Sequence, residues 1–137
     1  MINLVAGNMG RKANVAIRIN PDVNPKTHKY ITTGTKETKF GIDLNTAENI
    51  FDNASKYPNL NIRGIHVHIG SQITESAPYI KALKKVISFI RKEHLDVKIL
   101  NIGGGLGIIY SKEKPQTAKE FAQAILPILN NTDFKSF

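Results

Sequence analysis

LNIRGIHVHIGSQ, residues 60 to 72, is the stretch that decides the fold. Residues 60 to 70 are almost continuously apolar, rich in isoleucine, and end on a glycine. That pattern is typical of a strand covered on both faces, as the strands of a parallel sheet are. Within it His66 and His68 stand two positions apart, so both side chains lie on one face of the strand. The stretch therefore predicts a buried parallel strand with two imidazoles near its carboxyl end.

Two other stretches have the character of strands. VAIRIN, residues 15 to 20, is a β-branched run stopped by Pro21, and VKILNIGGG, residues 97 to 105, ends in glycines. With helical patterns between them, the order of strand, helix, strand, helix, strand, helix predicts an α/β protein with a parallel sheet. Three strands leave open sheet edges, which proteins usually cover or charge. We therefore interpret the chain as the central βα units of a larger barrel or open sheet.

The helices are predicted from their starts and stops. The first should begin at Asn45 or Thr46 and end at Pro58, and the most regular one lies within residues 76 to 95. Thr117 is the expected cap of a last helix. Pro127 lies inside that helix, and a kink or an early end is expected there because proline lacks the backbone N–H group.

Composition narrows the classes of function. The chain has 137 residues, is 41% hydrophobic and contains no long apolar run, which excludes a membrane-spanning helix and a signal peptide. The absence of cysteine excludes disulfides, thiolate metal sites and a cysteine nucleophile within this chain. The net charge of +8 comes from scattered lysines without interleaved aromatics, so a solvated surface is favoured over nucleic-acid binding. The cytoplasm is the expected compartment.

Polar and glycine residues follow each predicted strand, at the edge where βα proteins bind ligands. The first strand ends near Arg18, the second near Ser71, and the third in the glycine run 103 to 105. Successive backbone N–H groups of such a run can hold an anion, although a tight turn without a ligand is an equal alternative. The run is not a dinucleotide fingerprint, because Ile108 stands where the last glycine should be, and no P-loop lysine follows it.

The histidine pair has three interpretations. A His-x-His pair on a barrel strand can bind the metal of a hydrolase, but such a site needs three or four ligands. The other strand ends offer Asn20 and Asn101 rather than carboxylates. We interpret His66 as a core histidine, whereas His68 stands beside Gly70 and Ser71, whose hydroxyl and N–H groups suit a phosphate.

Three stretches carry a resemblance to a known family: VAIRINPDVNPKTHKYITTGTKETKFGID (15 to 43), GIHVHIGSQI (64 to 73) and LNIGGGLGI (100 to 108). In their order and spacing they resemble the pyridoxal-phosphate-dependent decarboxylases of diaminopimelate, ornithine and arginine, whose barrel is of the alanine-racemase type. The resemblance covers roughly residues 10 to 137, and HIGSQ and GGGLGI favour the diaminopimelate branch. It implies a partial TIM (β/α)8 barrel with pyridoxal 5'-phosphate as the cofactor.

The resemblance also implies roles for individual residues. His68 matches the histidine that stacks on the pyridine ring of the cofactor, and Ser71 matches a serine near the cofactor phosphate. Gly105, with Gly103 and Gly104 beside it, matches the loop whose backbone holds that phosphate. Arg18 matches an arginine at the end of a cofactor-side strand. The polar segment with Thr27, His28, Tyr30 and Thr33 matches a segment near the mouth of the active site.

Other parts of the family pattern have no counterpart here. The lysine that forms the Schiff base belongs upstream of residue 1, and a Glu-Pro-Gly-Arg strand and a C-terminal β-domain belong after Phe137. The resemblance thus implies that residues 1 to 137 are a fragment of the barrel domain with no catalytic residue and no activity alone. The whole enzyme would be a homodimer that converts meso-2,6-diaminopimelate to L-lysine and CO2. A non-catalytic phosphate-binding remnant and a metal-dependent barrel hydrolase remain as alternatives.

Overall fold

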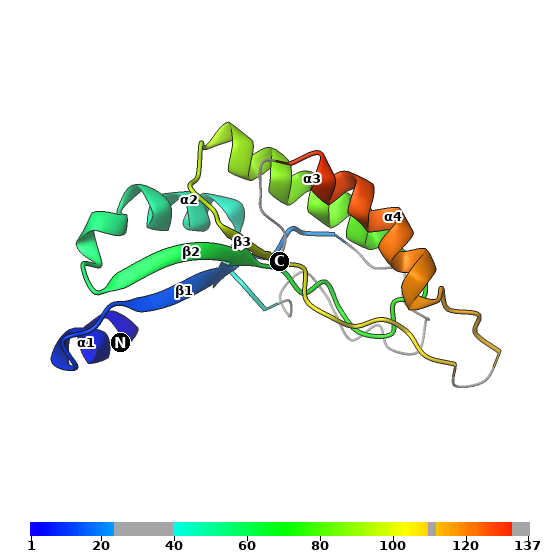
Figure 1. Cartoon of the computed structure of the whole chain (residues 1–137), viewed down its shortest axis with the longest axis horizontal. Helices are drawn as coiled ribbons and strands as arrows, with labels where there is room; N and C mark the ends of the chain where they lie inside the picture. The colour runs from blue at the N-terminus through cyan, green and yellow to red at the C-terminus, as the bar shows by residue number, and fades with distance from the viewer. Residues whose placement is uncertain (24–39, 110–111, 133–137) are drawn as a thin grey trace.

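The computed structural model describes residues 1–23, 40–109 and 112–132 (Figure 1). One sheet holds three parallel strands in the order β1-β2-β3. The strands are β1 (Ala13–Arg18), β2 (Leu60–His66) and β3 (Ile99–Asn101). The helices are α1 (Ile2–Asn8), α2 (Leu44–Asp52), the short 3-10 helix η2 (Ala54–Lys56), α3 (Ala77–Lys92) and α4 (Ala118–Asn130). The predicted α/β class and parallel sheet are confirmed, whereas the polar segment from Thr27 to Thr33 lies outside the described residues.

The register of the sheet sorts its residues into rows that run across the three strands. Ile17, Ile65 and Leu100 are aligned in one such row, and all three belong to the main hydrophobic core. The next row holds Arg18, His66 and Asn101, and because side chains alternate along a strand it points to the opposite face. The apolar row thus fixes which face carries the polar strand ends.

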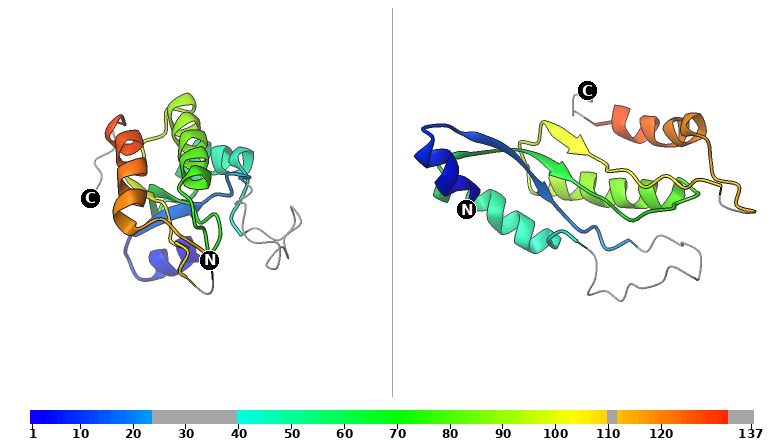
Figure 2. Two further views of the ribbon diagram at one scale, coloured as in Figure 1. Left: turned by 90° about the vertical axis from the view of Figure 1, so that its right-hand side faces the viewer. Right: turned by 90° about the horizontal axis from the view of Figure 1, so that it is seen from below.

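Helices α2, α3 and α4 all lie on the same side of the sheet (Figures 1 and 2). The main core fills the space between this side of the sheet and helices α2 and α3, and its buried members are Ile19, Ala47, Ile65, Val67, Val86, Phe89, Ile90 and Val97. A second cluster joins α3 to α4 and to the segment after β2, with Val23, Ile69, Ile73, Tyr79, Ala82, Leu83, Ile87 and Ile125 buried. The polar row therefore lies on the side without these three helices.

The start of α2 differs from the predicted one. The N-cap is Asp43, whose carboxylate accepts hydrogen bonds from the backbone N–H of Thr46 at 2.9 Å and from its hydroxyl at 2.7 Å. Asn45 and Thr46 are instead inside the helix, because a carboxylate placed three residues before a free N–H is already a strong cap. The helix ends at Asp52, and η2 separates it from Pro58.

The predicted helix within residues 76 to 95 is confirmed, and its apolar face is buried. The Thr117 cap of α4 is confirmed too, and Glu120 completes a capping box with it. The helix continues through Pro127 to Asn130, so the alternative of an early end was wrong. The last turns remain helical while Ile128 and Leu129 pack against the second cluster.

Strand β3 is shorter than the predicted stretch 97 to 105, and it ends at Asn101. Gly103 and Gly105 have positive φ angles of 76° and 103°, which a strand does not contain. Parallel pairing nevertheless resumes at an isolated bridge between Ile73 and Leu106. The glycines thus turn the chain away from the sheet just where the strand would have continued.

Candidate functional site

The ends of β1 and β2 bring Arg18 and His66 side by side on the sheet face opposite the helices. The guanidinium carbon of Arg18 lies 5.6 Å from the ring centroid of Phe40, a cation–π distance. Its Nε atom is buried and has no hydrogen-bond partner in the described part of the chain. A buried guanidinium N–H without a partner is costly, which makes Arg18 a strong donor for an anion at this edge.

His66 is half-buried in this row, and its environment disfavours its charged form. Burial is the main cause that lowers the pKa of His66, and the positive charge of Arg18 and the neighbouring His68 lower it further. A neutral imidazole beside a guanidinium leaves Arg18 as the charged group of the row. The interpretation of His66 as a core histidine stays a prediction, because its side chain is only half-buried and lies outside both hydrophobic clusters.

The glycine loop after β3 comes into direct contact with the segment after β2. A Cβ atom on Gly105 would collide with the carbonyl oxygen of Gly70 and would lie 3.3 Å from the Cα atom of Ser71. A Cβ atom on Gly103 would meet the carbonyl oxygen of Val67 at 2.5 Å. Glycine at positions 103 and 105 is therefore required by close backbone approach as well as by positive φ. The packing places Ser71, which is exposed, next to Gly105.

The backbone N–H groups of the glycine loop differ in whether they have a hydrogen-bond acceptor. Gly103 donates to the side-chain oxygen of Asn101 at 2.8 Å, and Gly104 donates to Nδ1 of His68 at 3.4 Å, a long contact. The N–H group of Gly105 has no hydrogen-bond partner among the described residues. The Nδ1 atom of His68 thus faces the loop. The N–H of Gly105 is available to another acceptor.

Within the described ranges there is no group of three histidine, cysteine, aspartate or glutamate residues that could hold a metal ion. The His66 and His68 pair thus has no third ligand of these types in that part of the chain. The geometry gives the metal-hydrolase alternative no support, whereas it unites the three predicted strand ends at one edge.

Two contacts of this site were not foreseen from the sequence. Phe40, beneath Arg18, follows a long polar segment and gave no signal. Tyr79 fits the buried apolar face of α3, yet its hydroxyl donates a hydrogen bond to the carbonyl oxygen of Gly104 at 2.5 Å. A tyrosine rather than a phenylalanine on a buried helix face is the one signal that pointed to a polar partner.

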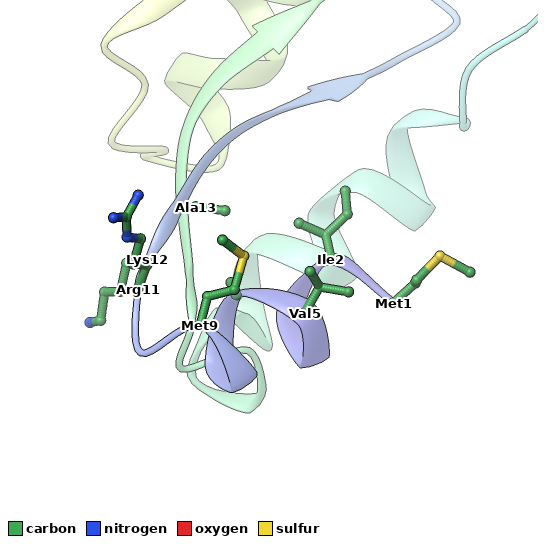
Figure 3. A pocket seen from close by; sticks show the side chains of 8 residues that line it. Met1, Ile2, Val5, Met9, Arg11, Lys12 and Ala13 are labelled. Atoms are coloured by element: carbon green, nitrogen blue, oxygen red, sulfur yellow. The ribbon is translucent and has the colours of Figure 1, made fainter.

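A separate pocket of about 350 Å³ lies at the other end of the sheet, where α1 meets the start of β1 (Figure 3). It is lined mainly by apolar side chains of α1, such as Ile2, Val5 and Met9, with Arg11 and Lys12 at its rim. Because these residues precede or begin β1, the pocket is at the amino end of the strand and takes no part in the site described above.

Comparison with known proteins identifies the family of the chain. A family model described as "Pyridoxal-dependent decarboxylase, pyridoxal binding domain" matches residues 1–135. The chain belongs to this family. The family membership predicted from the three sequence stretches is thereby confirmed, and so is the fold: the sheet is part of a (β/α)8 barrel like that of the structural relatives.

Relatives found by sequence and by structure are diaminopimelate decarboxylases. The chain is 46% identical to the diaminopimelate decarboxylase of Aquifex aeolicus and 44% identical to that of Methanocaldococcus jannaschii, over 98% and 92% of its own length. A structure of the Helicobacter pylori diaminopimelate decarboxylase complexed with L-lysine is 37% identical and superimposes with a TM-score of 0.83 over 97% of this chain. The chain spans only about a third of the length of these proteins, 33%, 30% and 34% respectively.

In residues 1–23, 40–109 and 112–132, no helix has the length and apolar character needed to span a bilayer.

Proposed function

We propose that residues 1 to 137 form the part of a diaminopimelate decarboxylase barrel that holds the phosphate and ring of pyridoxal 5'-phosphate. The single observation that carries the proposal is the meeting of three strand ends at one edge, where donors for an anion are left without partners. These donors are the buried Nε of Arg18 and the N–H of Gly105, with Ser71 beside the latter.

The residues at this edge fit the chemistry of the cofactor. A phosphate needs hydrogen-bond donors and positive charge, which the backbone of Gly105, the hydroxyl of Ser71 and the guanidinium of Arg18 offer. A planar aromatic ring needs a flat surface, which the half-buried imidazole of His68 offers. Gly104 has open space where its Cβ would be, since no atom of the described chain beyond its adjacent residues lies within 4 Å of that position.

When bound, pyridoxal phosphate supplies an electron sink for breaking a bond next to the amino group of an amino acid. The residues of this chain have positioning roles in that chemistry. Gly105 and Ser71 bind the phosphate, His68 orients the ring, and Arg18 supplies positive charge at the same edge. None of them is placed here to move a proton or to form a covalent bond with the cofactor.

The catalytic groups are therefore proposed to come from a longer protein in which this chain is the central part of the barrel domain. As the resemblance implies, that protein would be a cytoplasmic homodimer that converts meso-diaminopimelate to L-lysine and CO2. The alternative of a non-catalytic binder keeps the same site but lacks the added groups.

Cofactor binding is tested with pyridoxamine 5'-phosphate, because its amine cannot react with the many lysines of the chain as an aldehyde would. The chain should bind this compound more tightly than pyridoxamine, which lacks the phosphate, in calorimetric titrations at physiological salt. The variant His68→Ala should weaken the binding of both compounds, because each contains the ring. Equal affinity of the unchanged chain for the two compounds would contradict the proposed phosphate site.

Activity is tested in a chimera in which this chain replaces the matching third of the Aquifex aeolicus enzyme. The chimera should release CO2 from meso-diaminopimelate, whereas this chain alone should release none. Cofactor binding without turnover by the chimera would favour the non-catalytic binder instead.

A further inference from the structure

Tyr79 connects the glycine loop to the helical layer. It lies in the first turn of α3, is only 2% exposed, and donates its hydroxyl to the carbonyl oxygen of Gly104 at 2.5 Å. Its ring packs edge-on against Phe121 of α4, with the centroids 4.7 Å apart and the planes at 89°. The hydroxyl is thus held in place by packing from two helices before it reaches the loop.

Fixing this carbonyl oxygen also fixes the next N–H group. The C=O of Gly104 and the N–H of Gly105 belong to one peptide unit, and every described peptide bond is trans. In a planar trans peptide these two groups point in opposite directions. With the oxygen drawn toward buried Tyr79, the N–H of Gly105 must point away from the helical layer.

Without Tyr79, the glycine loop would hold the peptide unit between Gly104 and Gly105 less firmly in this orientation. Gly104 has no Cβ contact within 4 Å, and glycine has wide conformational freedom. The N–H of Gly104 reaches His68 only at 3.4 Å, which is a weak restraint. The hydrogen bond from Tyr79 is the short one at this peptide unit.

We propose that Tyr79 is a positioning residue, which turns the peptide between Gly104 and Gly105 so that the N–H of Gly105 faces the cofactor phosphate. The inference rests on the proposed function and adds a residue to it. Burial raises the pKa of Tyr79, so the hydroxyl remains protonated and able to donate near neutral pH. A phenylalanine would fill the same space, so only the hydrogen bond distinguishes the two residues.

The test compares Tyr79→Phe with the matched control Phe121→Leu, which loosens the same ring contact but leaves the hydroxyl in place. Both variants and the unchanged chain are titrated with pyridoxamine 5'-phosphate and with pyridoxamine. Tyr79→Phe should weaken binding of the phosphate compound about fivefold to tenfold, as expected when a hydrogen bond to a charged group is misaligned. Binding of pyridoxamine should change less than about twofold, and Phe121→Leu should keep the ratio of the two affinities.

The outcomes separate this inference from the function on which it rests. If folded Tyr79→Phe keeps the affinity ratio of the unchanged chain, Tyr79 has no positioning role, although the cofactor site stands. If the unchanged chain shows no preference for the phosphate compound, the site and the inference both fail. A second measurement needs no variant: pyridoxamine 5'-phosphate should shift the NMR amide signal of Gly105 more than that of Gly104. The reverse order would mean that the peptide is turned the other way.

Discussion

Gly105 and Gly104 are neighbours with opposite steric demands. At Gly105 a side chain would collide with the backbone of Gly70, and φ is 103°. At Gly104 a Cβ would have open space, and φ is outside the left-handed region. The sequence presents the two residues as equal members of one glycine run, and only the approach of the segment after β2 distinguishes them.

This difference predicts unequal effects of alanine. Gly105→Ala should lower the free energy of unfolding by about 2–4 kcal/mol, because the backbone of two segments must separate and the φ angle is strained. The matched change Gly104→Ala should alter it by less than about 1 kcal/mol. Urea unfolding followed by circular dichroism measures both, and equal losses would show that the loop does not pack as described.

The lowered pKa of His66 predicts a pH dependence. Its NMR titration should give a pKa below 6.5, the usual value for histidine, because burial and Arg18 disfavour the charged form. Arg18→Gln should raise this pKa only part of the way, since burial remains the larger cause. The unfolded chain binds the proton of His66 more readily than the folded chain does. The contribution of His66 to the free energy of unfolding should therefore be fully present above pH 6.5 and be lost as the pH drops through the folded-state pKa. A pKa above 6.5 would contradict this environment.

At the scale of elements, local sequence patterns predicted which helices form better than they predicted the residues at which the helices begin. The capping box of α4 was visible in the sequence at Thr117, because capping depends on residues only three positions apart. The cap of α2 was misplaced, because Asp43, Asn45 and Thr46 are all competent caps and the pairing of Ile42 with Ile19 determines where the chain leaves the sheet. Several residues can thus cap α2 by their local chemistry, and the pairing of the chain with the sheet determines which of them does.

The cap of α4 supports a prediction about stability. The hydroxyl of Thr117 accepts from the N–H of Glu120 at 3.2 Å, and the Glu120 carboxylate accepts from the N–H of Thr117 at 2.7 Å. Thr117→Ala should therefore reduce the free energy of unfolding by about 1 kcal/mol, whereas Thr117→Ser should restore most of it. Urea titrations of the three proteins provide the measurement, and a loss in the serine variant equal to that in alanine would argue against the cap.

At the scale of the whole molecule, the sheet is covered unevenly. Helices α2, α3 and α4 protect one side, while Ile99 on β3 remains 48% exposed, and Ile108 in the glycine loop remains 58% exposed. In the sheet register Ile99 is aligned with Ala16 and Gly64, two rows from Arg18. Exposed apolar residues beside a sheet edge are prone to pair with other chains.

The isolated chain should therefore associate increasingly as its concentration is raised, and it should bind the dye ANS. Ile99→Lys should reduce both effects, because a lysine at a strand edge opposes pairing. Leu126→Lys is the matched control, since Leu126 is equally exposed at 48% but lies on α4. Sedimentation velocity measures the association, and a sharp 15.2 kDa monomer boundary for the unchanged chain would refute the prediction.

The sequence by itself determined the alternation of strands and helices, the parallel sheet and the residues at its carboxyl edge, Arg18, His68 and Gly105 among them. These depend on periodicity and on short motifs, which are local properties of the chain. Only the tertiary structure decided that Tyr79 holds the carbonyl of Gly104, 25 positions away, and that Phe40 lies beneath Arg18. Such contacts join distant segments, and their geometry follows from the strand register and helix packing, which no local pattern encodes.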